Sequence, residues 1–127
     1  MANVRLDQTG IPKGPVYETT AAVVHRSGVT AVDATDPVDT SGAVDCSGYQ
    51  YCRFDVTIAG VGLTALTVQV LFWNSRQSKW FGGASRQFTG TGGYALAVPD
   101  ARGSIIFLKV TNFSGTSFSL SADYVLS

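Results

Sequence analysis

Residues 66–81 read LTVQVLFWNSRQSKWF, and this stretch decides the fold. In its first half, apolar side chains recur at every second position, which is the period of a strand with one face against a core. The inward-facing set is Leu66, Val68, Val70 and Phe72. The polar run at 74–78 predicts a turn, and residues 79–81 return as the second strand of a β-hairpin. A register shift of one residue would expose the whole apolar set, so the pattern specifies the pairing.

The rest of the chain continues in the same style. Its 127 residues fit one domain, and a composition rich in Val, Thr, Ser, Gly and aromatic residues predicts an all-β protein. Strands are expected before and after the hairpin at 16–25, 29–32, 44–46, 50–60, 85–89, 94–98, 104–112 and 118–126. We expect 29–32 to pair with 16–25 across a turn at 26–28, and Gly82-Gly83 to break the chain after the hairpin.

The spacing of these runs predicts the architecture. They recur at intervals of roughly a dozen residues, separated by turns of Gly, Pro, Asn and Asp, which is typical of two packed antiparallel sheets. The predicted fold is therefore an antiparallel β-sandwich or jelly roll of about eight strands, occupying residues 16–127. Residues 1–15, MANVRLDQTGIPKGP, are predicted to be an extended N-terminal arm, because their Gly and Pro residues prevent both a helix and a central strand. Such an arm is either a frayed end or a segment that lies across a neighbouring subunit.

Charge and hydropathy exclude several classes of partner. Nine basic residues balance nine acidic ones, so the field that would attract nucleic acid is absent. Residues 1–64 carry four basic and seven acidic residues, so this half of the sequence is acidic. Residues 65–127 carry five basic and two acidic residues, so the second half is basic. If the fold keeps these halves on different faces, opposite faces of two copies are complementary. No apolar run fits a signal peptide or a membrane span, so we expect synthesis in a cytoplasm and no contact with a membrane.

Residues that carry chemistry are few. His25 is the single histidine, and no G-x-S-x-G sequence is present, so the chain is not predicted to be an enzyme. Cys46 and Cys52 are interpreted as buried free thiols, with a disulfide or a metal site as alternatives. The aspartates at 33, 36, 39 and 45 lack the spacing of a calcium loop and predict a solvated acidic loop. No cofactor and no metal are expected.

Aromatic and apolar residues outside the inward-facing sets are the remaining candidates for function. Residues 104–112 are apolar on both faces, because Ile105 and Phe107 lie opposite the other aliphatic positions, which predicts either a central strand or an interface. Trp and Tyr carry much of the energy where proteins meet. The hairpin tip, with Trp73, Arg76 and its neighbours, is therefore predicted to contact a partner.

The whole pattern resembles a small β-sandwich virion protein of a tailed bacteriophage, in particular a capsid decoration (cement) protein. The resemblance is carried by the arm at 1–15, by the short Ser/Thr/Gly-rich strands after it, and by the closing SIIFLKVTNFSGTSFSLSADYVL at 104–126. It implies a homotrimer on the outer surface of the phage head that binds the major capsid protein and sister subunits, without direct nucleic-acid contact. The expected location is the virion, after synthesis in the host cytoplasm.

The residues predicted to contact partners come from three parts of the chain. They are Arg5, Ile11, Pro12, Trp73, Arg76, Lys79, Trp80, Ile105 and Phe107. One alternative is a phage receptor-binding or carbohydrate-binding module, in which aromatic rings form a platform for a sugar. That platform would use Trp73, Trp80, Phe81, Tyr49 and Tyr51. A third reading is a head-completion or tail structural protein.

Overall fold

A computed structural model describes residues 16–18 and 25–127, and these residues form nine strands and no helix. The strands are β1 (Val16–Glu18), β2 (His25–Val29), β3 (Val44–Asp45), β4 (Cys52–Ala59), β5 (Ala65–Asn74), β6 (Lys79–Phe88), β7 (Gly92–Val98), β8 (Ile105–Ser114) and β9 (Phe118–Leu126). The predicted all-β class is confirmed. The predicted arm at 1–15 lies outside the described residues, as does the stretch 19–24 of the first predicted strand.

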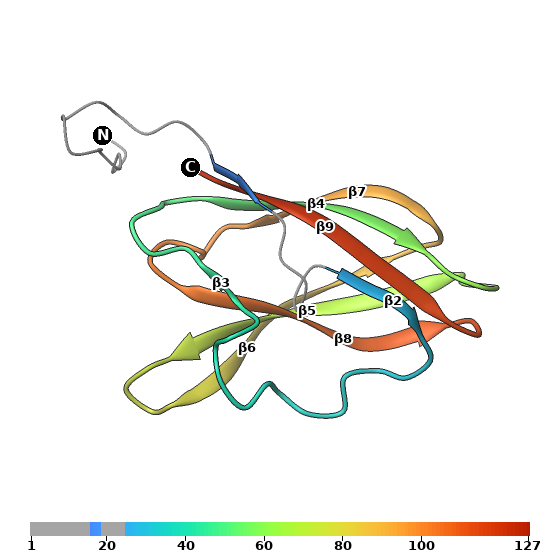
Figure 1. Ribbon diagram of the computed structural model, residues 1–127, viewed down its shortest axis with the longest axis horizontal. Helices are drawn as coiled ribbons and strands as arrows, with labels where there is room; N and C mark the ends of the chain where they lie inside the picture. Colours follow the sequence, from blue (N-terminus) through green and yellow to red (C-terminus); the bar gives the residue numbers. More distant parts are fainter. Residues whose placement is uncertain (1–15, 19–24) are drawn as a thin grey trace.

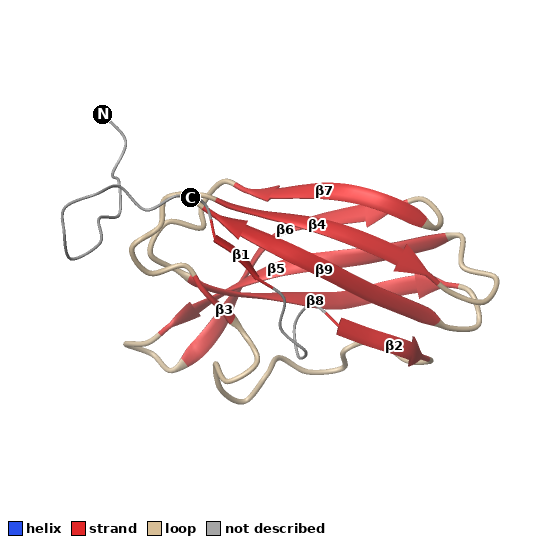
Figure 2. Ribbon diagram, turned by 45° about the horizontal axis from the view of Figure 1, so that its top comes forward, coloured by secondary structure: helices blue, strands red, loops and turns tan. Residues whose placement is uncertain are grey.

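The strands form two antiparallel sheets that pack face to face (Figures 1 and 2). The five-stranded sheet has the order β1-β9-β4-β7, with β2 pairing beside β1 on the same edge of β9. The four-stranded sheet has the order β3-β8-β5-β6. This is the predicted β-sandwich. The C-terminus lies at the same end of the molecule as the loop between β3 and β4 (Figure 1).

Strand pairing is nested along the chain. β5 pairs with β6, β4 with β7, β3 with β8, and β9 with both β1 and β2. The chain is therefore one long hairpin whose two arms are wound together into two sheets, which is the topology of a jelly roll. The predicted hairpin of residues 66–81 is the tip of this winding, so it is confirmed as the element around which the fold is organised.

The core lies between the two sheets and follows the predicted alternation. β4 alternates strictly between buried and exposed residues over its eight positions, with Phe54 and Ile58 inside. The inward residues of β5 and β8 meet them from the other sheet. Three phenylalanines, Phe54, Phe88 and Phe118, are among the largest fully buried side chains. Because apolar burial stabilises by roughly 25 cal/mol per Å², this layer supplies the main driving force for folding.

The predicted break at Gly82-Gly83 is wrong, because β6 continues through both glycines to Phe88. The register of β5 against β6 shifts between Gln69 and Leu71, which marks a bulge at this point. A Cβ atom on Gly83 would lie 2.5 Å from Cε2 of Phe72. The glycine is therefore needed for close packing within the strand and does not end it.

The predicted hairpin between 16–25 and 29–32 is also wrong. β1 and β2 both pair with β9, and residues 26–28 belong to β2 itself. The β2–β9 register shifts between Arg26 and Val29, and Gly28 has a φ of 60° and donates its N–H to Oγ of Ser119. The Arg-Ser-Gly sequence therefore forms a bulge within β2. β9 is long enough to pair with the two short strands β1 and β2 in succession.

Candidate binding surface on the four-stranded sheet

Apolar side chains occupy the outer face of the four-stranded sheet as well as its inner face. Leu71 of β5 is paired with Phe107 of β8, and Trp73 of β5 is paired with Trp80 of β6. Leu71 and Trp80 are buried, yet neither belongs to the core cluster between the sheets. With Ile105, which alternation places on the same face, these residues form what we call the outer cluster.

A loop of the same chain crosses this face. The N–H of Asp33 donates a 2.9 Å hydrogen bond to the carbonyl of Val110 in β8. The N–H of Val110 in turn donates a 2.8 Å hydrogen bond to the carboxylate of Asp33. Asp36 forms a 2.9 Å ion pair with Lys109, and the carbonyl of Pro37 accepts a 2.8 Å hydrogen bond from the indole N–H of Trp80. Because β5 lies between β8 and β6, residues 33–37 pass over the sheet from one strand to the other.

Trp80 joins this loop to the aromatic side chains below it. Its ring lies edge-on to Trp73, with 5.2 Å between centroids, and 6.1 Å from the ring of Phe107. Only 7% of the residue is exposed. Its N–H and most of its surface are therefore used within the chain, which stabilises the loop on the sheet.

An open depression of about 460 Å³ lies between the loop and the hairpin tip. Its lining residues are Asp36, Pro37, Val38, Trp73, Ser78, Lys79, Trp80, Phe81 and Gly82. Val38 is 95% exposed and Phe81 41% exposed, and the ammonium of Lys79 lies 5.0 Å from the centre of the Phe81 ring. Because Phe81 is paired with Phe72, its ring projects from the opposite face of β6 to that of Trp80. Val38 is therefore the exposed apolar group on the Trp80 side of the depression.

The structure brings together part of the predicted contact set. Trp73, Lys79 and Trp80 line the depression, and Arg76 is exposed in the adjoining turn. Ile105 and Phe107 are half-buried in the outer cluster. Arg5, Ile11 and Pro12 lie outside the described residues. Tyr49 lines a separate hollow with Gly48, Arg102 and Gly103, so it does not share a surface with the tryptophans.

Residues 36–38 contribute to the depression and were missed at the level of sequence. Their composition predicts a solvated loop, and nothing in it indicates that the loop returns to a sheet. The strands do carry a sign that a loop covers the sheet. Leu71 and Trp73 of β5 and Phe107 of β8 are apolar residues at outward-facing positions, where polar residues are expected. Apolar residues on both faces of a strand require a covering layer on each side.

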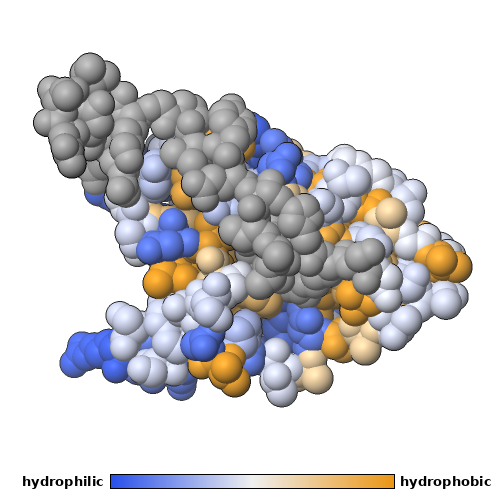
Figure 3. All heavy atoms as spheres, viewed as in Figure 1, coloured by the Kyte–Doolittle hydropathy of each residue, from blue (hydrophilic) through white to orange (hydrophobic). Residues whose placement is uncertain are grey.

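The face seen in Figure 3 carries hydrophobic residues as small separate groups among polar ones. No continuous apolar band is visible there, apart from what the grey atoms cover. Contact surfaces on soluble proteins are often of this mixed kind, with a few large side chains in a polar surround. The lining of the depression is likewise mixed, with Trp73 and Val38 beside Asp36 and Lys79.

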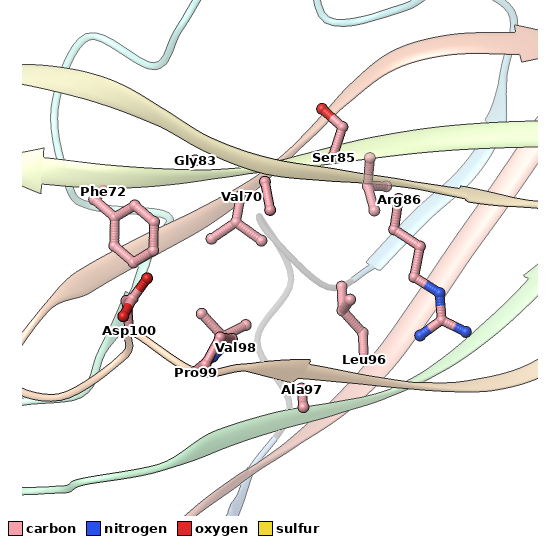
Figure 4. A pocket seen from close by; sticks show the side chains of 12 residues that line it. Val70, Phe72, Gly83, Ser85, Arg86, Leu96, Ala97, Val98, Pro99 and Asp100 are labelled. Atoms are coloured by element: carbon pink, nitrogen blue, oxygen red, sulfur yellow. The ribbon is translucent and has the colours of Figure 1, made fainter.

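A second, narrower cavity of about 110 Å³ opens between the edge strands β6 and β7. Val70, Leu96 and Val98 project into it, with Arg86 beside Leu96 at one end and Phe72 near Asp100 at the other (Figure 4). Arg86 donates a 2.6 Å hydrogen bond to the carbonyl of Ala95 and so ties the two edges together. This contact blocks the pairing of another strand at that carbonyl.

Titratable groups in the described part of the chain are dispersed. No three His, Cys, Asp or Glu residues among those described are placed to hold a metal ion. The hydroxyl and N–H of Ser41 bond to the carboxylate of Asp39 and lower its pKa. Cys46 and Cys52 are buried and free. The acidic and basic halves of the sequence are not on separate faces, because β4 from the first half is paired with β7 and β9 from the second.

Comparisons with protein-family models, curated proteins and solved structures give no match to this chain. Among the described residues there is also no helix long and apolar enough to span a membrane.

Proposed function

We propose that this protein is a structural component of a virion, a decoration protein that binds the outer surface of a phage head and stabilises it by protein contacts. The observation that carries the proposal is the depression on the four-stranded sheet, which the 95% exposed Val38 lines together with Trp73 and Lys79. Large apolar groups on a folded surface are stabilised when a partner covers them.

The rigidity of this surface supports a binding role. Loop residues 36–38 are held by the Asp36–Lys109 ion pair and by the hydrogen bond from Trp80 to Pro37. A partner would then meet groups already in place, so little conformational entropy is lost on binding. The contact needs no catalytic group, since attachment is the whole function.

The jelly-roll topology is compatible with this role, because jelly rolls are frequent in viral capsid domains. Fold alone does not assign function, so the virion assignment rests on the resemblance of the sequence together with the surface. Under this proposal residues 1–15 make a second contact, with the capsid or a sister subunit of a homotrimer.

A glycan-binding module is the competing function, since jelly rolls are also frequent in lectins. Half-buried Trp73 favours it, as an aromatic ring beside an open depression. Trp80 disfavours it, because its ring is covered and its N–H is bonded within the chain. Tyr49 lines a separate hollow and Phe81 projects from the other face of β6, so neither ring joins the two tryptophans in the predicted aromatic platform.

The proposal is tested with particles of the phage that encodes the chain. The gene is deleted and complemented with wild type, with Val38→Asp or with Val61→Asp. Val61 is the matched control, because it is 65% exposed and lies beyond the opposite end of β5. We expect Val38→Asp to fold, by circular dichroism, but to be depleted at least tenfold from purified heads, whereas Val61→Asp is retained.

Three results would contradict the proposal. One is the absence of the wild-type chain from purified heads, and another is retention of Val38→Asp at the wild-type level. The third is a monomer at micromolar concentration whose tryptophan fluorescence shifts with added glycans, which would favour the competing function. Removal of residues 1–15 is a separate test of the arm, and we expect the truncated chain to fold and to attach poorly.

A further inference from the structure

The two cysteines lie at the same end of the sandwich but are supplied by different sheets. Cys46 directly follows β3 of the four-stranded sheet, and Cys52 begins β4 of the five-stranded sheet. Both residues belong to the core cluster, with exposures of 0% and 3%. Their thiols are close enough for Cys46 to raise the pKa of Cys52. The pair therefore bridges the two layers of the fold.

Backbone hydrogen bonds hold both cysteines in this position. The N–H of Cys46 donates to the carbonyl of Ser104 over 2.8 Å, and its carbonyl accepts from the N–H of Tyr49 over 3.0 Å. Cys52 is paired on one side with Val98 of β7 and on the other with Leu126 of β9. Because neither backbone is free to move away, the thiols stay adjacent in the folded protein.

We propose that Cys46 and Cys52 form an internal disulfide that links the two sheets when the protein meets a disulfide oxidant. In a reducing cytoplasm the pair remains as two thiols. With oxidised glutathione, one cysteine thiolate attacks the S–S bond, forms a mixed disulfide and releases one glutathione thiol. The second cysteine thiolate then attacks the protein sulfur of the mixed disulfide and releases the other. The protein loses two electrons and two protons, and one oxidised glutathione becomes two reduced ones.

The surroundings predict that this reaction is slow in the closed structure. Contact with the Cys46 thiol and burial raise the pKa of Cys52, so little of the attacking thiolate exists at neutral pH. Residues 47–51 connect the two cysteines, and Ser47 and Gly48 in this loop are exposed. Opening of the loop would admit the oxidant. We therefore expect the disulfide to form slowly even though the fold favours it at equilibrium. Slow formation distinguishes this pair from the exposed cysteine pairs of redox enzymes.

The experiment measures how strongly the fold favours the bond. The reduced full-length chain is equilibrated with mixtures of reduced and oxidised glutathione, free thiols are alkylated, and intact mass gives the fraction with the internal bond. The titration is repeated in concentrated urea. We expect the folded chain to be half oxidised at a ratio of oxidised glutathione to the square of reduced glutathione that is about tenfold or more below that of the unfolded chain.

The result that would overturn the proposal is an equal or higher ratio for the folded chain, since the fold would then strain the bond. Accumulation of glutathione adducts or of disulfide-linked dimers in place of the internal bond would overturn it as well. Cys46→Ala and Cys52→Ala are the controls. Each should retain one thiol, and the urea midpoint should rise on oxidation only in the wild-type chain. The proposal is independent of the virion assignment.

Discussion

The outer faces of the two sheets differ in what covers them. On the five-stranded sheet, β4 presents exposed Arg53, Asp55 and Thr57 to solvent in strict alternation with its core residues. On the four-stranded sheet, the corresponding face carries Leu71 and Trp80, both buried outside the main core. Among the described residues the first sheet is therefore wet over β4, whereas the second has a third, partial layer made by residues 33–37.

This difference shows how a loop becomes part of the packing. Residues 33–37 have the composition of a solvated turn, but four contacts attach them to β8 and β6. Burial of the outer cluster offsets the entropy of ordering the loop. The exposed depression exists because this layer ends at Val38, so the candidate contact surface depends on the loop being in place.

The largest expected effect comes from emptying the outer cluster. Leu71→Ala should lower the free energy of unfolding by about 2–5 kcal/mol, because a buried aliphatic side chain is removed and a cavity remains. The matched change on the other sheet, Thr57→Ala, should cost less than about 0.5 kcal/mol. Urea unfolding measures both. Equal effects would mean that the two outer faces do not differ in packing.

A smaller effect is expected from filling the space at the bulge of β6. In Gly83→Ala the new Cβ would lie 2.5 Å from the Phe72 ring and 3.0 Å from the carbonyl oxygen of Val70. We expect a loss of about 1–3 kcal/mol from this overpacking. Gly93→Ala on β7 is the control, because its nearest neighbour would be 4.0 Å away. A neutral Gly83→Ala would show that β6 can shift away from β5.

The link between loop and sheet is tested by Trp80→Phe. The ring is kept in part, but the carbonyl of Pro37 loses its 2.8 Å hydrogen bond. We expect a loss of about 1–2 kcal/mol and faster proteolysis of the loop. Trp73→Phe, at a half-buried position of the same face, should leave the proteolysis rate close to that of wild type. Protection of the loop in Trp80→Phe would contradict its attachment through this bond.

The smallest effect is expected from the ion pairs. Lys109→Met removes the partner of Asp36, and because the Lys109 side chain is only 19% exposed we expect a loss of up to about 1 kcal/mol. Arg53→Met breaks the Arg53–Asp55 pair on the five-stranded sheet, where both side chains are about half exposed. Its effect should lie near zero. Both differences should decrease in high salt, and a larger loss for Arg53→Met would reverse the comparison of the faces.

Much of the fold could be predicted because alternation is a local property. The strand at 50–60, the hairpin at 66–81 and the final strand all have apolar residues at every second position, and the structure confirms them. Predictions failed where one residue type serves two purposes. The pair Gly82-Gly83 predicts a break in the strand, but in the structure it allows close packing. Gly28 predicts a turn, but in the structure it forms a bulge.

The candidate site was predicted only in part, for a related reason. Trp73, Lys79 and Trp80 could be selected because large aromatic and basic residues at a strand end are conspicuous in a sequence. Val38 could not, since a valine among aspartates carries no pattern. Its exposure follows from where Pro37 is attached, and that attachment is to Trp80, which is 43 residues away in the chain.

The sequence by itself determined the strands, their inward faces and the hairpin at the centre of the winding, because these depend on side-chain alternation within a few residues. Tertiary structure alone decided which strands pair, which loop covers the outer cluster, and that Cys46 and Cys52 lie in contact. These features join residues whose separation the chain does not encode locally. They are selected by how well distant surfaces pack and satisfy one another's hydrogen bonds.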